Sequence, residues 1–446
     1  LINKQKYIFS LFVKIFVFLT FLFARTFMGL TFFGYRLGEY IIGGALVLFL
    51  IFCILIPIFK KRYFLENKSI NICVILLVVT FIYSNFLNDV SFSNVFIYKT
   101  SSYIWSLGAI LIGYYLLNDK VFMIYKEDIY LSFVGLVVIY IYSTRGISEN
   151  LQNFFLNYTD KFEYPKGSDL LLAFIFVFYI FLIRKQFSQS SLIVLFLVGA
   201  LYAPLFLVKS RSAFLSLVIF SLITLPKFKQ NIKKLNKYFY ISAILSLIVF
   251  AISSSWVVSR DIKVDEDITD DIKFAITSRY HTINDNVYEE TVLNVSLFYF
   301  KDGRIFSSDG NLNWRLQIWQ DIWRDMVKSN KLINGYGYDG LIPSMDSDQR
   351  LGQDGTNINV HNYVMHILSR GGLIHLLICF MIYYALFKEF RSRSISLDYK
   401  LLVFPLIFNS LFDPSMENAH YSIIMYILIG LALNNRIILK EENLKL

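Results

Sequence analysis

Cysteine and charged residues are both scarce in this chain of 446 residues. Its three cysteines, Cys53, Cys73 and Cys379, lie inside apolar stretches without a C-x-x-C spacing, so neither a disulfide framework nor a thiolate metal site is indicated. Charged residues make up 17% of the chain and hydrophobic residues 56%, which excludes the composition of an average soluble globular protein. The sequence is that of a membrane protein.

The positive charge of the chain does not mark a nucleic-acid binder. There are 43 lysines and arginines against 33 acidic residues, a net charge of +10. These basic residues do not cluster on a soluble domain but sit in short runs between apolar stretches. Such runs are expected for loops that hold a multi-pass protein in its orientation, so no nucleic-acid partner is expected.

Apolar stretches of a length suited to a bilayer recur along the chain. About twelve are predicted, at 7–24, 38–59, 71–87, 102–117, 129–144, 169–183, 191–208, 212–226, 238–257, 362–387, 401–412 and 421–439. The stretches at 212–226 and 401–412 are the shortest and are candidates for re-entrant or broken helices. The predicted fold class is an all-α integral membrane protein.

The distribution of loop charges gives the orientation. Twelve spans put both termini on one side, and the basic runs lie on that side, at Lys4, Lys6, 60–68, Lys120, Lys126, Arg184, Lys185, 227–237, 388–400 and Lys440. The positive-inside rule makes this side the cytoplasm. The first stretch lacks a small-residue cleavage site, so we expect it to stay as a membrane anchor and not to act as a cleaved signal peptide.

One large loop interrupts the predicted bundle on the outer side. The expected organisation is a bundle of about nine helices at 1–257, a loop with short helices at 258–361, and about three further helices at 362–446. Residues 260–359 contain 17 acidic and 11 basic side chains, so the loop is acidic and the rest of the chain is basic. No solenoid or inverted transporter repeat is visible.

Two cations occupy the very short turn between the seventh and eighth stretches, at Lys209 and Arg211. This turn is predicted to face outward, where the positive-inside rule disfavours cations. Snorkelling to the lipid headgroups is one interpretation. The other is a fixed guanidinium at the outer mouth of the bundle, suited to bidentate hydrogen bonds with a phosphate or pyrophosphate.

A helical periodicity runs through residues 313–326 of the large loop. Its apolar face consists of Ile318, Trp319, Ile322, Trp323 and Met326, and its polar face of Gln317, Gln320, Asp321, Arg324 and Lys328. Arg315 falls in the middle of the apolar face, where an unpaired cation is costly. Either Arg315 snorkels or pairs with a loop carboxylate, or the helix aims it into the bundle. Arg324 points the other way and needs no function.

His361 is predicted at, or just before, the N-terminus of the tenth stretch. There the helix dipole disfavours the imidazolium, which suits a general base, although a hydrogen-bonded structural histidine is the alternative. In a regular helix its face also carries Met365, Leu368 and Gly372. A glycine at that place lets another backbone or a ligand approach closely.

Arg370 lies deep enough in the same predicted helix to need a partner. Asp413 or Glu417, between the last two stretches, is the predicted partner, and the pair is expected to give structural support. The other histidines outside this motif, His281, His375 and His420, are interpreted as structural.

Two further motifs lie in the large loop. Residues 346–348 (DSD) resemble the DxD pattern that binds a metal and a nucleotide sugar, but they lie in an acidic loop on the side that lacks nucleotide sugars. Residues 334–340 alternate glycine and tyrosine, which fits a tight turn whose aromatic rings either stack on sugars or pack on the loop helix.

These elements occur in one order: the R-x3-L turn from Arg211 to Leu215, the loop helix NWRLQIWQDIW, the turn NGYG, and H-x9-G from His361 to Gly371. The arrangement resembles the O-antigen ligase and O-antigen polymerase superfamily of bacterial inner-membrane glycosyltransferases. The resemblance covers the topology of the whole chain, with motif matches confined to about 200–375. It implies transfer of a glycan from undecaprenyl pyrophosphate to an acceptor sugar hydroxyl on the periplasmic face, without a cofactor, nucleotide sugar or required metal.

The resemblance also implies roles for single residues. Arg211 and Arg315 match the arginines that hold the pyrophosphate, and His361 matches the histidine proposed to activate the acceptor hydroxyl. The remaining site candidates are Lys209 and Arg279 for the pyrophosphate, with Gly371, Gly372 and Arg370 in support. The family pattern usually continues from its second glycine into a small or apolar residue, so the adjacent glycines followed by His375 depart from it in local helix packing.

Polymerase and ligase differ in the acceptor, which is a second lipid-linked repeat unit for the polymerase and the lipid A core for the ligase. The NGYG turn and the long aromatic loop favour a polymerase, which would be expected to work with a chain-length regulator. A transporter of lipid-linked oligosaccharide is the alternative from another class. Transporters usually place polar residues near the midplane and show repeats, whereas the candidates here gather at the outer surface.

Overall fold

The computed structural model describes residues 2–41, 43–44, 47, 68–91, 96–118, 126–159, 162–185, 189–228, 237–264, 298–301, 303–307, 310–346, 359–392 and 396–443. Within these ranges the chain is mostly helical and has few strands. It divides into two compact units. The bundle unit comprises residues 1–76, 98–258 and 380–446, and the loop unit comprises residues 77–97 and 259–379.

Six helices of the described chain are long and apolar enough to cross a membrane: Leu11–Met28, Ser69–Leu87, Ser190–Lys209, Arg211–Phe228, Tyr240–Val257 and Tyr363–Ser392. They coincide with six of the predicted stretches, including the short one at 212–226. The shorter apolar helices Ser102–Tyr114, Gly167–Leu182 and Ala419–Leu433 coincide with three more. The stretch at 38–59 lies largely outside the described residues, so the total of about twelve spans stays a prediction, as do the predicted domain boundaries.

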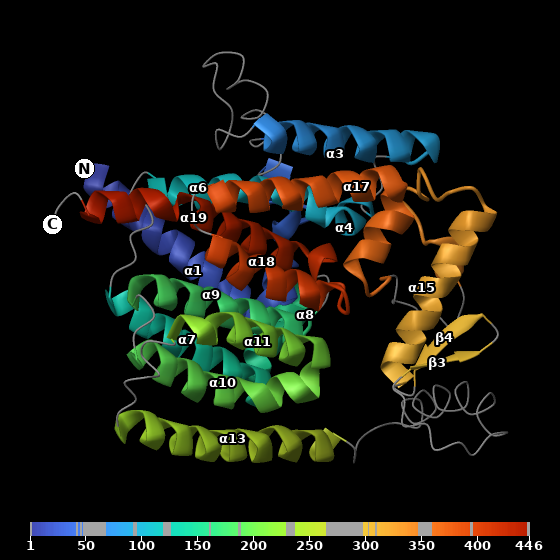
Figure 1. Cartoon of the computed structure of the whole chain (residues 1–446). Coiled ribbons are helices and arrows are strands. Elements are labelled where there is room, and N and C mark those ends of the chain that lie inside the picture. The colour runs from blue at the N-terminus through green and yellow to red at the C-terminus, as the bar shows by residue number, and fades with distance from the viewer. Residues whose placement is uncertain are drawn as a thin grey trace. The chain divides into compact units, whose positions relative to one another are not determined.

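The elements of the bundle unit follow the predicted order (Figure 1). They are α1 (Ile2–Met28), β1 (Thr31–Phe32), β2 (Tyr35–Arg36), α5 (Ser102–Trp105), η2 (Ser106–Gly108), α6 (Ala109–Asn118), α7 (Lys126–Arg145), α8 (Glu149–Tyr158), α9 (Gly167–Lys185), α10 (Gln189–Lys209), α11 (Arg211–Thr224), η3 (Leu225–Phe228), α13 (Lys237–Val264), α18 (Ser396–Ser410), η5 (Ser415–Glu417) and α19 (Ala419–Asn443).

Helix α9 forms the centre of the bundle unit. Every residue from Leu170 to Leu182 is buried, as expected for a helix that is apolar all round. The helix packs against α1, α7, α10, α11, α18 and α19. Because protein surrounds it on all sides, α9 needs no lipid-facing stripe.

Helix α8 was not predicted, because residues 145–168 lie between the predicted apolar stretches at 129–144 and 169–183. It begins at Glu149, after the N-cap residue Ser148, and its axis is bent by 88° from that of α7. Gly146 permits this bend with a φ of +83°. Phe155 is buried against Phe23 and Tyr142, which anchors α8 to the bundle. The left-handed Gly146 therefore sets the bend between α7 and α8, and burial of Phe155 holds α8 in place.

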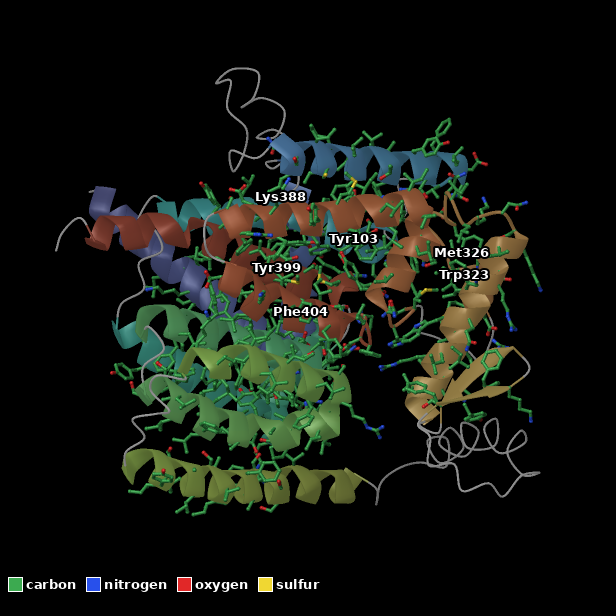
Figure 2. All side chains as sticks on the ribbon, in the orientation of Figure 1. Tyr103, Trp323, Met326, Lys388, Tyr399 and Phe404 are labelled. Carbon is green, nitrogen blue, oxygen red and sulfur yellow. The ribbon has the colours of Figure 1, made fainter. Side chains whose placement is uncertain are left out.

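The last part of α17 (Tyr363–Ser392) also belongs to the bundle unit. Tyr399 of α18 donates a hydrogen bond to the carbonyl of Tyr383 at 3.1 Å. Its ring packs edge-on against Phe387 and Phe390, at centroid distances of 5.5 and 5.3 Å. Figure 2 labels Tyr399. This aromatic contact joins the short helix α18 to its neighbour in sequence.

The loop unit contains a hairpin, a helix and the first part of α17. Its elements are β3 (Phe298–Lys301), β4 (Arg304–Ser307), α15 (Gly310–Lys328), η4 (Pro343–Met345), α17 up to Cys379 and the part of α3 (Lys68–Leu87) from Leu77 onward. Helix α4 (Phe96–Thr100) lies at the boundary of the two units. β3 and β4 pair in antiparallel fashion.

Candidate functional site

The predicted loop helix is confirmed as α15. Ile318, Ile322 and Met326 are fully buried, and Arg315 lies on the same stripe, partly buried. The assignment of Trp323 to the apolar face is wrong, because its side chain is 49% exposed. Each four-residue step advances by about 40° beyond a full turn, which carries Trp323 to the edge of the stripe. Figure 2 labels Met326 and Trp323 on this helix.

The polar face of α15 holds the β3–β4 hairpin. Gln320 donates to the carbonyl of Ile305 and accepts from its amide, both at 2.8 Å. Asp321 forms an ion pair with Arg304. Arg324, for which no function was predicted, donates to the carbonyl of Gly303 at 3.2 Å. This face therefore has a structural role that the helical pattern alone did not reveal.

His361 lies two residues before the start of α17, as predicted. Its φ is +56°, so it is outside the helix in the left-handed region. Asn362 then caps the helix by accepting from the amide of Met365 at 2.9 Å. The prediction that His361 shares a helical face with Met365 and Leu368 is wrong, because helical spacing does not apply to a residue in this conformation.

Two tryptophans of α15 fix the position of His361. The ring of Trp314 meets the imidazole edge-on, with centroids 5.2 Å apart. The indole N–H of Trp319 donates to the carbonyl of Val360 at 2.9 Å. Sequence reasoning assigned neither residue to the site, although both belong to the NWRLQIWQDIW motif. The sequence feature that could have indicated their role is that the two tryptophans flank Arg315 in this motif.

Replacing Trp319 by phenylalanine is expected to lower activity about three- to tenfold, because loss of one hydrogen bond of about 1 kcal/mol releases the backbone next to His361. Steady-state kinetics of the purified protein would measure this change. Trp323→Phe is the matched control on the same helix, because Trp323 is half exposed. Equal activities of the two variants would contradict a positioning role for Trp319.

Helix α17 is broken at Gly372, where φ is 77° and ψ is −178°. Only glycine adopts this conformation readily. A Cβ atom at Gly372 would also overlap the carbonyl group of Ile333. The predicted close approach of another backbone is therefore confirmed, whereas the regular helix assumed through this position is wrong. The adjacent Gly371 has a different neighbour, since a Cβ there would meet the ring of His375.

Residues 331–337, here called the clamp loop, satisfy the backbone groups at the break. Three backbone hydrogen bonds join the two segments, with the donor first: Tyr336 to Ser369 (2.8 Å), Gly337 to Arg370 (2.9 Å) and Leu373 to Leu332 (2.9 Å). Ser84 of α3 also bonds to the carbonyl of Arg370, at 3.0 Å. Buried backbone groups need partners, so the break and the clamp loop depend on each other.

The Arg370 side chain reinforces the same arrangement. It is 2% exposed, and its Nη1 donates to the carbonyls of Gly340 at 2.5 Å and Gly337 at 3.2 Å. Its guanidinium carbon also lies 5.8 Å from the ring centroid of Phe96. The sequence predicted a carboxylate partner, and the structure shows backbone carbonyls. Asp413 and Glu417 belong to the bundle unit, so their pairing with Arg370 stays a prediction.

The Gly/Tyr motif at 334–340 packs inside the loop unit. Tyr338 is fully buried, with its ring 4.9 Å from Phe81 and 6.2 Å from His375. Tyr336 bonds to Ser329 at 2.8 Å, and burial raises the pKa of its phenol, which therefore stays neutral. Tyr338 therefore packs inside the protein, but against α3 and α17 and not against the loop helix α15 as predicted. His375 is structural, as expected, and bonds to Thr80 at 2.8 Å.

The bundle unit carries the other two predicted cations at the junction of α10 and α11. Lys209 ends α10 and donates to the carbonyl of Pro165 at 3.0 Å. Arg211 is exposed and is the first residue of α11. Ser210 caps that helix by accepting from the amide of Ala213 at 3.3 Å. The predicted tight turn between two membrane helices is confirmed.

Several sequence candidates lie outside the described residues, namely Arg279, His281, Cys53 and residues 347–348 of the DSD motif. Cys73 and Cys379 are free and buried. No group of three histidine, cysteine, aspartate or glutamate side chains is placed to hold a metal ion within the described ranges. The roles predicted for Arg211, Arg315 and His361 remain predictions, because the geometry fixes their positions within each unit and not their chemistry.

A comparison with protein families matches residues 203–381 to a model described as O-antigen ligase. The matched segment contains the Lys209–Arg211 turn, α15 with Arg315, and His361 at the start of α17. The search of curated proteins found no match.

Proposed function

Because the chain belongs to the O-antigen ligase and polymerase superfamily, we propose that it transfers a glycan from undecaprenyl pyrophosphate to a sugar hydroxyl. The reaction takes place on the periplasmic face of the bacterial inner membrane, with both termini in the cytoplasm. The six apolar helices support a multi-pass membrane setting. Lipid-linked glycans are then the substrates, as this superfamily implies.

The contact between α15 and His361 carries this proposal. Trp314 packs on the imidazole at 5.2 Å, and Arg315 is the next residue in the same helix. One rigid helix therefore supports both a candidate base and a candidate pyrophosphate ligand. A site on a rigid element keeps its groups in register better than a site on separate loops.

Arg211 supports the same function from the bundle unit. As the first residue of α11 it places an exposed guanidinium beside the amide groups of the helix N-terminus. The exposed guanidinium and the helix N-terminus together suit a phosphate group. A pyrophosphate is the anion that the proposed donor supplies.

In the proposed reaction the acceptor oxygen attacks the anomeric carbon of the donor sugar while His361 removes the hydroxyl proton. The bond from that carbon to the pyrophosphate oxygen breaks, and undecaprenyl pyrophosphate leaves with the electron pair. Arg211 and Arg315, assisted by Lys209, stabilise the charge that develops on the leaving group. Because the guanidinium groups stabilise this negative charge, the proposed reaction requires no metal ion.

We take a second lipid-linked repeat unit as the acceptor, which makes the protein a polymerase that works with a chain-length regulator. The long aromatic loop at 258–361 supports this choice. The NGYG turn at 334–337 supports it as well. The alternative acceptor is the lipid A core, which would make the protein a ligase.

The test is a gel profile of surface polysaccharide in a deletion strain complemented with the wild-type gene. For a polymerase, the deletion strain is expected to show the core with one repeat unit, and complementation is expected to restore a ladder of longer chains. Capping of the core from an accumulated lipid-linked polymer would instead establish the ligase. If well-expressed His361→Ala, Arg211→Ala and Arg315→Ala proteins restore the same profile as the wild type, the three-residue site is wrong, and the transporter of lipid-linked oligosaccharide is favoured.

Arg315→Ala is expected to lower transfer at least 100-fold, because one fixed group that stabilises developing charge contributes about 3 kcal/mol. Arg324→Ala is the matched control on the opposite face of α15, where Arg324 contacts the hairpin. Transfer rates of both purified variants with lipid-linked glycan would be compared at equal amounts of folded protein. A similar loss in both would assign Arg315 a structural role.

A further inference from the structure

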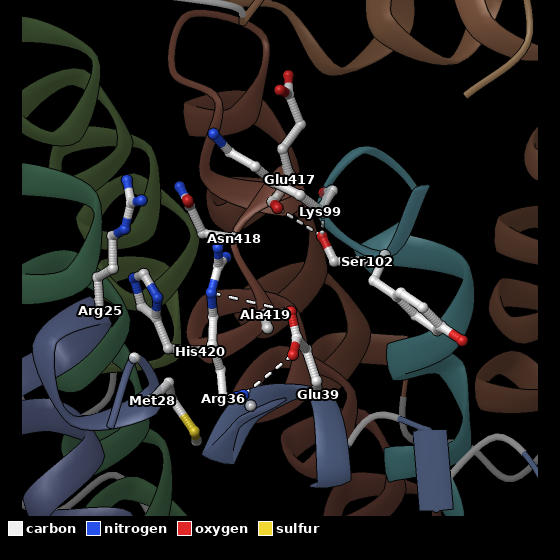
Figure 3. Close-up of a pocket in the computed structure, with 13 residues that line it drawn as sticks. Arg25, Met28, Arg36, Glu39, Lys99, Ser102, Glu417, Asn418, Ala419 and His420 are labelled. Atoms are coloured by element: carbon white, nitrogen blue, oxygen red, sulfur yellow. Dashed lines mark hydrogen bonds and ion pairs between the residues drawn. The ribbon is translucent and has the colours of Figure 1, made fainter. Parts of the chain in front are cut away.

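The bundle unit contains a pocket that the proposed chemistry does not use (Figure 3). Connections far apart in sequence meet there: the end of α1 with the β1–β2 hairpin, the residues before α5, and the segment between α18 and α19. Its charged lining residues are Arg25, Arg36, Lys99, Glu39 and Glu417. All three connections are predicted to lie on the outer side of the membrane.

Hydrogen bonds fix the walls of the pocket. Arg36 donates its backbone amide to a carboxylate oxygen of Glu39 at 3.0 Å, and its Nε lies 3.8 Å from the other oxygen. Ser102 donates to the carbonyl of Glu417 at 2.5 Å. His420 lines the pocket and pairs with Asp169 of α9 at 2.9 Å. The pocket is therefore built on the core helix α9.

The pocket is lined by both hydrogen-bond donors and acceptors. Arg25, Arg36 and Lys99 can only donate, and the carboxylates of Glu39 and Glu417 can only accept. A phosphate offers mainly acceptors, so two carboxylates in its site would repel it. A sugar ring carries hydroxyl groups that donate and accept at once, which suits this mixed lining. Asn418 and Ser102 add neutral groups of both kinds.

The pocket is connected to the Lys209–Arg211 turn through one segment. Glu163 lies 3.7 Å from Arg25 of the pocket. Two residues later, the carbonyl of Pro165 accepts from Lys209 at 3.0 Å. Asp169, at the start of α9, reaches His420. When the pyrophosphate of a lipid-linked glycan lies at Arg211, its sugar chain therefore extends along the side of the bundle unit that carries this pocket.

We propose that this pocket binds a sugar residue of the lipid-linked glycan and so forms a glycan subsite in the bundle unit. The inference rests on the proposed function for its ligand class. It assigns roles to Arg36, Glu39 and Glu417 that neither the proposed catalysis nor the family comparison includes. The three connections that form the pocket lie outside the matched residues 203–381.

The test measures binding of two probes to the purified chain in lipid nanodiscs by saturation-transfer NMR. The first probe is the oligosaccharide repeat unit released from the strain's own surface polysaccharide, and the second is inorganic pyrophosphate. Arg36→Gln and Glu417→Gln are each expected to weaken oligosaccharide binding about tenfold, the worth of one hydrogen bond to a charged group. Glu149→Gln, an exposed change on α8 of the same unit, is the control and should bind like wild type.

The sign of the Glu417→Gln effect separates the two ligand classes. A sugar subsite loses an acceptor and binds more weakly, whereas an anion site loses a repulsive charge and binds pyrophosphate more tightly. Tighter pyrophosphate binding, or unchanged oligosaccharide binding in both folded variants, would overturn the proposal. If Arg36→Gln does not fold, Glu39→Gln gives the same comparison.

Kinetics keep this proposal distinct from the proposed function. Pocket variants should raise KM for the lipid-linked glycan about tenfold with little change in kcat. An inactive wild-type protein that still binds the oligosaccharide would contradict glycan transfer and leave the subsite standing. An active protein whose KM is unaffected by both substitutions would remove the subsite and leave transfer in place.

Discussion

Replacing His361 by alanine is expected to lower the rate of glycan transfer by about 10²–10⁴-fold, the usual contribution of a general base. The loss is expected in kcat, because the role proposed for this histidine is to remove the acceptor proton and not to hold the pyrophosphate. Transfer rates of the purified variant with lipid-linked glycan would show it, and on gels the polysaccharide ladder would disappear. His361→Gln, which keeps a polar side chain, should be equally slow because an amide does not accept the proton.

A structural role for His361 predicts a different pattern. Since Trp314 packs against the imidazole, loss of that contact alone would lower the melting temperature of the alanine variant and leave much of the activity at lower temperature. Glutamine would then restore part of the function. A transfer rate within tenfold of wild type in well-folded His361→Gln would contradict the general base.

Replacing Gly372 by alanine is expected to destabilise the protein by about 2–6 kcal/mol. The unfavourable φ and ψ cost about 1–3 kcal/mol, and overlap of the new Cβ with the carbonyl of Ile333 adds about 1–3 kcal/mol. Thermal unfolding in detergent would measure the loss as a lower melting temperature, or the variant would fail to accumulate in membranes. Gly335→Ala should act in the same direction, because its Cβ would overlap the Arg370 carbonyl.

Gly340→Ala is the matched control for both substitutions. Gly340 follows the clamp loop closely, but a Cβ there meets nothing within 4 Å. This variant should unfold like the wild type. Equal stability of Gly372→Ala and Gly340→Ala would contradict this prediction. It would mean that the fold does not require the break in α17 and that the clamp loop does not depend on it.

Much of the site follows from local sequence patterns. The period of apolar residues in α15 predicts which side chains are buried, and Ile318 and Met326 are buried accordingly. The end of the large loop predicts that His361 precedes a membrane helix. These features depend on residues within a few turns of one another, so a single sequence contains the information that specifies them.

The remaining features depend on residues far apart in the chain. The break at Gly372 is stable only because the clamp loop and Ser84 supply its hydrogen-bond partners. Gly372 predicts that another backbone approaches closely, but nothing at 370–372 predicts which segment of the chain supplies it. The pocket is likewise invisible to local patterns, because Arg36 and Glu417 come from opposite ends of the sequence and each is unremarkable as a loop residue.

Helix α8 has a consequence for the depth at which the protein meets its substrate. It turns 88° from α7 and exposes Leu151, Phe154 and Leu156, so it suits the boundary between hydrocarbon and headgroups. Segment 163–169, which follows α8, reaches Lys209. The isoprenoid tail of the proposed donor would keep its phosphates at that same boundary. With α8 lying there, the Lys209–Arg211 turn would be held at the height of these phosphates.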